Sequence, residues 1–131
     1  MGGDAINVAG RLFAVGLRDW PGEALDLMTE DVVIHASDGH IYVGHEGCAR
    51  WYEEQISGHR ELVYAPGSAE LLRKSWVLMN GSAERTRRDG EKQIQPGCWL
   101  VHVRDGLIAA VLYYRTEQDA RAALSEQHPE D

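Results

Sequence analysis

Three side chains in the second half of the chain carry groups that move protons or bind oxyanions: Glu84, Tyr113 and Arg115. Glu84 lies two residues from Ser82 and from Thr86, a spacing that puts all three side chains on one face of a strand. On a face removed from water, a carboxylate is suited to act as a general acid or base. An ion pair with Arg115, or a position at the wet end of a pocket, is the alternative for Glu84.

Two tyrosines, Tyr113 and Tyr52, could donate hydrogen bonds to a ligand oxygen. Aromatic residues at such positions often serve only for packing, so we favour packing for Tyr52 and give more weight to a donor role for Tyr113. Arg115 could bind a carboxylate or an enolate, because its guanidinium group matches two acceptor oxygens at once.

These residues lie in a region that reads as long strands joined by tight turns. Apolar and β-branched runs predict strands over 62–72, 75–88, 92–104 and 107–116, with turn signals at Asp89-Gly90 and Asp105-Gly106. Before them, helical spacing predicts helices over 4–18, 21–29 and 44–57, and two short strands at 32–35 and 41–43. A short helix that frays is expected over 117–131. The pattern is that of an α+β domain spanning residues 1–131, with three N-terminal helices packed on a curved antiparallel sheet.

The turn at Asp89-Gly90 decides which side chains face inward. If the turn has two residues, the numbers of opposed residues add up to 179, and Glu84 faces Gln95. One face then carries Trp76, Leu78, Asn80, Ser82, Glu84, Gln95, Trp99, Val101 and Val103. We assign this face to a pocket, because aromatic groups mixed with a few polar ones are typical of small-molecule sites. A shift by one residue would exchange the faces and replace Glu84 by Arg85 and Arg87.

For the last strand too, the length of the preceding turn decides which side chains face inward. A three-residue turn with Gly106 in the left-handed conformation points Val111, Tyr113 and Arg115 inward, and a two-residue turn points Ala110, Leu112 and Tyr114 inward. We favour the three-residue turn.

The opposite face of the sheet is then too apolar for open solvent, because it carries Val77, Met79, Ala83, Ile94, Cys98 and Leu100. Burial against a second subunit would cover it, which predicts a homodimer through this outer face.

Several aromatic residues predict a ring-containing ligand. Trp51, Trp76 and Trp99 can form an aromatic wall, although an ordinary core is the alternative for them. The residues expected to contact the ligand are Trp51, Tyr52, Trp76, Asn80, Ser82, Gln95, Trp99, Val101 and His35.

Neither a metal nor a cofactor is indicated. His35, His40 and His45 are spaced by five residues but span a strand, a turn and a helix start, and they lack a carboxylate partner motif. The chain also lacks the glycine-rich patterns that bind nucleotides.

The net charge and the lengths of the apolar runs limit the partners and the location that we expect. The chain has 131 residues, 21 acidic and 13 basic, and a net charge of -8, which disfavours nucleic acid and anionic membranes as partners. Apolar runs such as Leu107–Leu112 are far shorter than a membrane span, and Met1 leads into Gly-Gly-Asp, so a cytoplasmic location is expected.

The order of these segments resembles the nuclear transport factor two-like superfamily, in its SnoaL-like branch. The resemblance rests on Ala24-Leu25-Asp26-Leu27-Met28-Thr29-Glu30-Asp31-Val32-Val33-Ile34-His35, on Asp38-Gly39 followed by Tyr42-Val43-Gly44, and on Asp105-Gly106-Leu107-Ile108 before Tyr113-Tyr114. It implies a cone-shaped α+β barrel around an apolar pocket. Members include polyketide cyclases, ketosteroid isomerases, limonene epoxide hydrolases, dehydratases and binding modules.

The residues depart from the isomerases of this superfamily. Ala36 stands where their general-base aspartate is expected, Trp99 where their second aspartate is expected, and Leu12 and Phe13 near the place of their tyrosine. The acid that cyclases and epoxide hydrolases carry on the last strand is replaced around 113–115. Two functions therefore fit: proton transfer through Glu84 on a small hydrophobic, oxygenated molecule, or a non-catalytic binding or dimerisation module.

Overall fold

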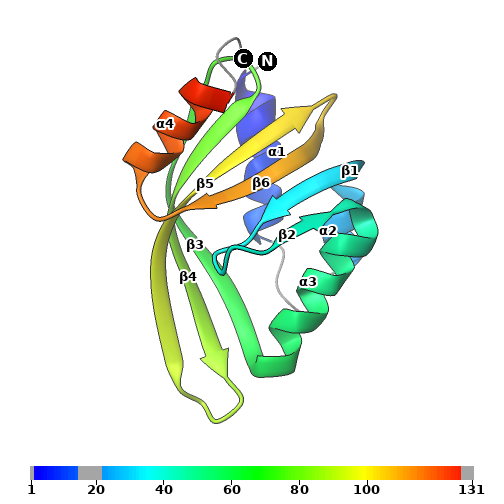
Figure 1. The fold of residues 1–131 in the computed structure, drawn as a ribbon, viewed down its shortest axis with the longest axis vertical. Coiled ribbons are helices and arrows are strands. Elements are labelled where there is room, and N and C mark those ends of the chain that lie inside the picture. The colour runs from blue at the N-terminus through cyan, green and yellow to red at the C-terminus, as the bar shows by residue number, and fades with distance from the viewer. Residues whose placement is uncertain (1, 15–21, 128–131) are drawn as a thin grey trace.

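The structure, a computed structural model, describes residues 2–14 and 22–127. The elements follow one another as α1 (Gly2–Ala14), α2 (Gly22–Asp26), β1 (Met28–His35), β2 (Ile41–Val43), α3 (Gly44–Gly58), β3 (His59–Leu72), β4 (Trp76–Arg87), β5 (Lys92–Arg104), β6 (Leu107–Tyr114) and α4 (Glu117–Gln127). The α+β class with a curved sheet is confirmed, and the third helix, α3, follows the two short strands β1 and β2 (Figure 1). Residues 15–18 of the predicted first helix, residue 21 of the predicted second helix, and 128–131 of the predicted last helix lie outside the described residues.

Two predicted boundaries in the first half change. The second helix does not reach Thr29, because β1 already begins at Met28. Met28 lies opposite Ile108 of β6, and the amide of Ile108 donates to the carbonyl of Leu27 over 2.7 Å. Pairing with a distant strand therefore overrides the local helical pattern of this segment.

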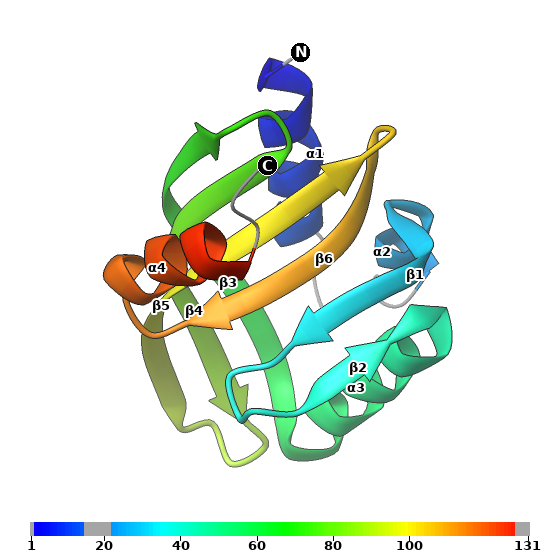
Figure 2. The ribbon, with the colours of Figure 1, turned by 45° about the horizontal axis from the view of Figure 1, so that its top comes forward.

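The six strands form one sheet in the order β2-β1-β6-β5-β4-β3. Neighbours pair antiparallel except β1 and β6, which run parallel. The sheet curves around α1, with α3 closing the open side near β1 and β2, and α4 lies across the outside (Figures 1 and 2). This curvature creates a concave inner face, on which a pocket can form.

The predicted register of the β4–β5 hairpin is wrong by one residue. Arg87 donates its amide to the carbonyl of Glu91, and Gly90 closes a three-residue loop with a φ of 94°. Opposed residues therefore add up to 178, as in the pairs Met79 with Trp99 and Ala83 with Gln95. The glycine takes the left-handed conformation that such a loop needs. As a result, the alternate residues of β4 from Val77 to Arg85 face inward, and Glu84 faces outward.

The β5–β6 connection differs from the prediction but gives the predicted orientation. Arg104 lies opposite Leu107, so the turn has only two residues, Asp105 and Gly106, both with positive φ. The register then shifts by one residue between His102 and Val103. This bulge reverses the side-chain alternation, so Val111 and Tyr113 still face inward.

Two apolar clusters lie on the two sides of the sheet. The inner cluster joins α1, α3 and the concave face, and it includes Val77, Met79 and Ala83, which the sequence analysis wrongly placed outside. The outer cluster consists of Trp76, Leu78, Cys98, Leu100 and Leu112, covered by Ala120 and Leu124 of α4. Helix α4 thus covers part of the face expected to be buried in a dimer, and homodimerisation stays a prediction. None of the described helices has both the length and the apolar composition of a membrane span.

Candidate functional site

A partly open pocket lies between the concave face of the sheet, α1 and α3. Its aromatic lining is Phe13, Trp51, Tyr64, Trp99 and Tyr113; its polar lining is His35, Ser37, Asp38, Gln55, Arg85 and Gln95; the remaining lining is Leu12, Met28, Ile34, Ala36, Ala83 and Val111. The pocket therefore combines a mainly apolar wall with a small set of polar groups, as small-molecule sites do.

Trp99 is at the centre of the aromatic wall. Its ring makes edge contacts with Phe13 and Tyr64, each with centroids 5.5 Å apart, and with Tyr113 at 5.6 Å. Phe13 and Tyr64 also contact each other at 4.9 Å. Edge-to-face packing of this kind holds each ring in a defined position. Burial raises the pKa of Tyr64 to about 12, so its hydroxyl stays protonated.

A chain of hydrogen bonds crosses the polar side of the pocket. Arg85 Nη1 donates to Gln95 Oε1 over 2.8 Å, and Gln95 Nε2 donates to the Tyr113 hydroxyl over 3.3 Å. The Tyr113 hydroxyl in turn donates to the carbonyl of Pro96 over 3.4 Å. The three side chains come from three neighbouring strands, β4, β5 and β6. They present a guanidinium group and a phenol to the same space.

Glycine at position 97 makes room for the Tyr113 ring. Gly97 follows Gln95 by two residues and shares its face of β5. A Cβ atom at this position would lie 2.5 Å from Tyr113 Cε1 and 3.3 Å from its hydroxyl. The ring can therefore lie across the strand only because residue 97 has no side chain.

The turn between β1 and β2 forms one rim of the pocket. Asp38 accepts hydrogen bonds from the backbone amide and from the ring Nδ1 of His40, both at 2.9 Å. Partial burial works against ionisation of Asp38, but the bonds from His40 outweigh it and lower its pKa. The hydrogen bond to Asp38 raises the pKa of His40. The carboxylate on this rim is thus already partnered by a residue of its own turn.

Helix α3 supplies Trp51 and Gln55 and is tied to β2. The hydroxyl of Tyr42 donates to Glu54 Oε2, and this bond is the main reason why the pKa of Tyr42 rises to about 12. Gly47 lets the helix approach the strand, because a Cβ there would lie 3.1 Å from the Tyr42 backbone. These two contacts set the distance of α3 from the sheet.

Of the residues predicted to contact a ligand, four line the pocket, His35, Trp51, Gln95 and Trp99, and so does Tyr113, which was predicted as a catalytic residue. Val101 faces inward but is fully buried in the inner cluster, and Tyr52 packs against that cluster.

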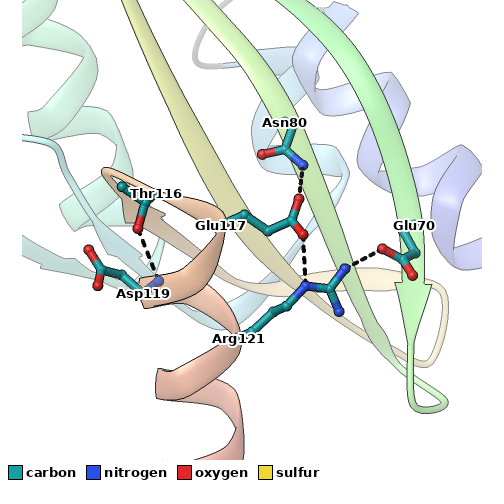
Figure 3. Close-up of polar contacts among 6 residues, drawn as sticks. All are labelled: Glu70, Asn80, Thr116, Glu117, Asp119 and Arg121. Carbon is teal, nitrogen blue, oxygen red and sulfur yellow. Dashed lines mark hydrogen bonds and ion pairs between the residues drawn. The ribbon is translucent and has the colours of Figure 1, made fainter.

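The other predicted site residues lie elsewhere because of the register error in β4. Trp76 belongs to the outer cluster, where it stacks on His102, and Ser82 is on the same outer face. Asn80 donates to Glu117 of α4 over 2.7 Å (Figure 3). Glu84, whose side chain is 40% exposed, pairs with Lys92 at 3.5 Å rather than pointing inward. Arg115 follows the end of β6 and is exposed. The predicted cluster of Glu84, Tyr113 and Arg115 is therefore not formed.

Arg85, Tyr64 and Phe13 are pocket residues that the sequence analysis did not select. Arg85 was named there only as the outcome of a shifted register, so the turn geometry was the missing information. Among the described residues, no group of three histidine, cysteine or acidic side chains lies close enough together to hold a metal ion.

A six-stranded curved sheet, with three helices before its strands β3 to β6, and an inner pocket, is the architecture of the nuclear transport factor two-like class of α+β proteins. Residues 11–111 match the family model described as SnoaL-like domain, and the chain belongs to this family. A candidate polyketide cyclase from Xanthomonas campestris pv. campestris has a similar structure, with a TM-score of 0.75, 19% identity, and coverage of 92% of this chain and 96% of that one.

Two further structures show the same fold. A nuclear transport factor two-like protein from Anabaena variabilis has a TM-score of 0.70 and 20% identity, over 85% of this chain and 89% of its own. TerC, co-crystallized with polyporic acid, has a TM-score of 0.69 and 16% identity, over 94% and 98%. No curated protein matches the chain.

Proposed function

We propose that this chain binds a small hydrophobic molecule that contains a ring and at least one oxygen, in the pocket on the concave face. The observation that supports this most directly is that one pocket holds both the aromatic wall around Trp99 and the hydrogen-bond chain from Arg85 to Tyr113. The aromatic wall suits a ring of the ligand, and the hydrogen-bonded side chains suit its oxygen.

The aromatic wall argues for a ring because of its geometry. Phe13, Tyr64 and Tyr113 all meet Trp99 edge-on. A planar ligand can extend this arrangement with an additional edge or offset contact, and such pairs contribute about 0.5–1.5 kcal/mol beyond the burial of their area.

Proton transfer on the bound molecule is the second candidate function, and it is favoured by the Tyr113 hydroxyl, which lines the pocket on the same hydrogen-bond chain as Arg85. A phenol can donate to the oxygen on which negative charge develops, and a guanidinium group can stabilise that charge while solvent accepts the proton released from carbon. His35 does not belong to this pair, because it lies opposite Leu112 of the outer cluster. Tyr113 therefore stays, and Arg85 replaces the predicted Glu84, as a candidate for chemistry of cyclase, isomerase, dehydratase or hydrolase type.

The chain's own tryptophans allow a direct test of binding. Trp51 and Trp99 line the pocket, whereas Trp76 is beneath α4 on the other side of the sheet. We expect benzoylacetone, a ring with an enolisable diketone, to shift the indole ¹H–¹⁵N signals of Trp51 and Trp99 but not that of Trp76. Equal shifts of all three signals, or no shift of any, would contradict a ligand pocket on the concave face.

A matched pair of variants tests the location. Ala83 lines the pocket, and Ser82 precedes it on the opposite face of β4. Ala83→Leu should fill the pocket and weaken benzoylacetone binding at least tenfold, and Ser82→Leu should change it less than twofold. If Ala83→Leu proves too unstable to assay, Ala36→Leu at the end of β1 blocks the same space.

The catalytic candidate has its own readout. In D₂O, the protein should speed deuterium exchange at the carbon between the two carbonyls of benzoylacetone, and Tyr113→Phe should remove this effect while retaining binding. Binding without any effect on exchange would leave a non-catalytic ligand-binding module.

We also propose homodimerisation through the part of the outer face beside α4. Ile94 is 68% exposed and Val63 is 45% exposed, and both lie opposite Glu84 on its neighbouring strands. Sedimentation velocity should show a dimer that Ile94→Glu dissociates; a monomeric native protein would reject this proposal.

A further inference from the structure

Arg85 differs in its surroundings from Arg104 and Arg121, the arginines of the surface that form ion pairs. Arg104 pairs with Asp31 at 2.7 Å, and Arg121 pairs with Glu70 at 2.6 Å. Arg85 instead lines the pocket, partly buried, and its hydrogen-bond partner is the neutral amide of Gln95. Within the described part of the chain, no carboxylate lies within 4.0 Å of its guanidinium group.

The nearest candidates for a counter-charge are already engaged. Glu84, the preceding residue, points to the other face and pairs with Lys92. Asp38 lines the pocket but is held by His40 in its own turn. Among the described residues, other arginines outside such pairs, for example Arg87, are exposed to solvent, whereas Arg85 is partly buried in the pocket wall.

An uncompensated cation in an apolar pocket needs a partner. Removing a charge from water costs several kcal/mol unless it is paired and hydrogen-bonded. A guanidinium group has five N–H donors, and one of these is donated to Gln95. The remaining donors can receive two oxygens of one carboxylate, or the oxygen of an enolate, at the pocket wall.

We infer that the natural ligand is an anion, and that its carboxylate, enolate or phenolate pairs with Arg85 while its ring packs on Trp99. This inference rests on the proposed function, since it assigns the charge of the ligand in the same pocket.

Gln95 fixes the direction of the hydrogen bonds beside Arg85. Because its Oε1 accepts from Arg85, its Nε2 must donate to Tyr113, and the Tyr113 hydroxyl then has its proton available for an acceptor. In the free protein the acceptor is the carbonyl of Pro96 at 3.4 Å, a long bond that a ligand oxygen can replace. A second oxygen near the anionic group therefore fits this position.

The space in the pocket limits the ligand to a small one. The cavity measures about 60 Å³, less than half of the roughly 150 Å³ that encloses a benzene molecule in an apolar protein cavity. Because the pocket is partly open, a single ring can enter with its anionic end foremost and keep its far edge at the mouth.

A cationic ligand is the competing assignment, because aromatic walls also bind quaternary ammonium groups. The position of Arg85 disfavours it, since a second positive charge in the same pocket would be repelled. Asp38, the acid that could attract a cation, already accepts two hydrogen bonds from His40.

Three single-ring probes of similar size separate these assignments: benzoate, benzamide and phenyltrimethylammonium. Binding is followed by the indole signals of Trp51 and Trp99 in a chloride-free buffer. We expect benzoate to bind at least tenfold more tightly than benzamide, as charge-assisted hydrogen bonds to one guanidinium predict. Phenyltrimethylammonium should bind most weakly.

Two substitutions with the same change in net charge provide the control. Arg85→Met should abolish the preference for benzoate and leave benzamide binding within threefold of the native value. Arg87→Met removes a charge from the exposed end of the same strand and should retain the preference. Arg85→Lys should keep part of it, because it retains the charge without the two-pronged geometry.

The outcomes distinguish a failure of the anionic-ligand inference from a failure of the proposed function. Equal or tighter binding of benzamide or of the cation, or a benzoate preference that survives Arg85→Met, overturns the anionic ligand while leaving the pocket in place. No shift of Trp51 or Trp99 with any of the three probes overturns the proposed function and, with it, this inference.

Discussion

The substitution Gly97→Ala is the sharpest test of how the pocket is built. A Cβ atom at residue 97 would lie 2.5 Å from Tyr113 Cε1, and ordinary contact begins at 3.4 Å, so the ring must move by about 0.9 Å or more. The Tyr113 hydroxyl already makes long bonds, 3.3 Å from Gln95 and 3.4 Å to Pro96. A displacement of this size therefore breaks at least one of them.

The expected cost follows from overpacking. Extra methyl groups in well-packed sites cost about 1–3 kcal/mol, and a strand alanine recovers about 0.5–1 kcal/mol relative to glycine through the unfolded state. We expect Gly97→Ala to lower the free energy of unfolding by about 1–2 kcal/mol. It should also weaken benzoylacetone binding, because both the phenol and the Trp99 edge contact shift with the ring.

Urea denaturation of four proteins checks this reasoning: the native chain, Gly97→Ala, Tyr113→Ala and the double variant. Removing the ring gives the new methyl group space, so the cost of Gly97→Ala should fall below about 0.5 kcal/mol in the Tyr113→Ala background. The same cost in both backgrounds would show that the backbone of β5, rather than the ring, needs the glycine. Gly10→Ala, in α1 with open space around its Cβ, is the control and should stabilise the protein by about 0.5–1 kcal/mol.

Two further predictions concern ionisable groups. Because the hydrogen bond to Asp38 raises the pKa of His40, Asp38→Asn should lower that pKa in an NMR titration. In the native chain, the stability that protonated His40 adds to the fold through this pair is fully present just below pH 6.5, and it is lost as the pH rises through the raised pKa. An unchanged titration would mean that the pair does not persist in solution. Burial raises the pKa of Cys48 to about 12 and that of Cys98 to about 11, so neither thiol should react readily with a disulfide reagent at pH 8. Leu124→Ala, which loosens α4, should speed the reaction of Cys98 and not of Cys48; equal acceleration of both would indicate global unfolding instead.

The sequence predicted elements well where the signal was local. Strand 41–43 and strand 92–104 have their predicted bounds, and the helix beginning at Gly44 ends within one residue of its predicted end. Each has its own start or stop signal, such as the glycines that flank the helix. The start of β1 was missed because it depends on pairing of Met28 with Ile108, eighty residues away, which no local pattern reveals.

The site was harder to predict because side-chain alternation amplifies a small error. Asp89-Gly90 marks a turn, but the dipeptide fits both a two-residue loop and the three-residue loop that Arg88 begins. One residue of difference moved Glu84 and Asn80 to the outer face and brought Arg85 inward. The charged group that β4 contributes to the pocket thus changed sign, from a predicted carboxylate to a guanidinium group.

The last strand shows why the strands must be treated separately. Its turn has two residues where three were predicted, yet Tyr113 faces the pocket because a bulge after His102 adds the missing residue. The prediction was right only because two deviations cancelled. In β4 no such bulge separates the turn from the pocket, since the pairing with β5 runs unbroken from Thr86 back to Trp76. The identity of the inward charged residue therefore depends on the turn alone, and changing the loop length at 88–90 is the most direct way to exchange Arg85 for Glu84.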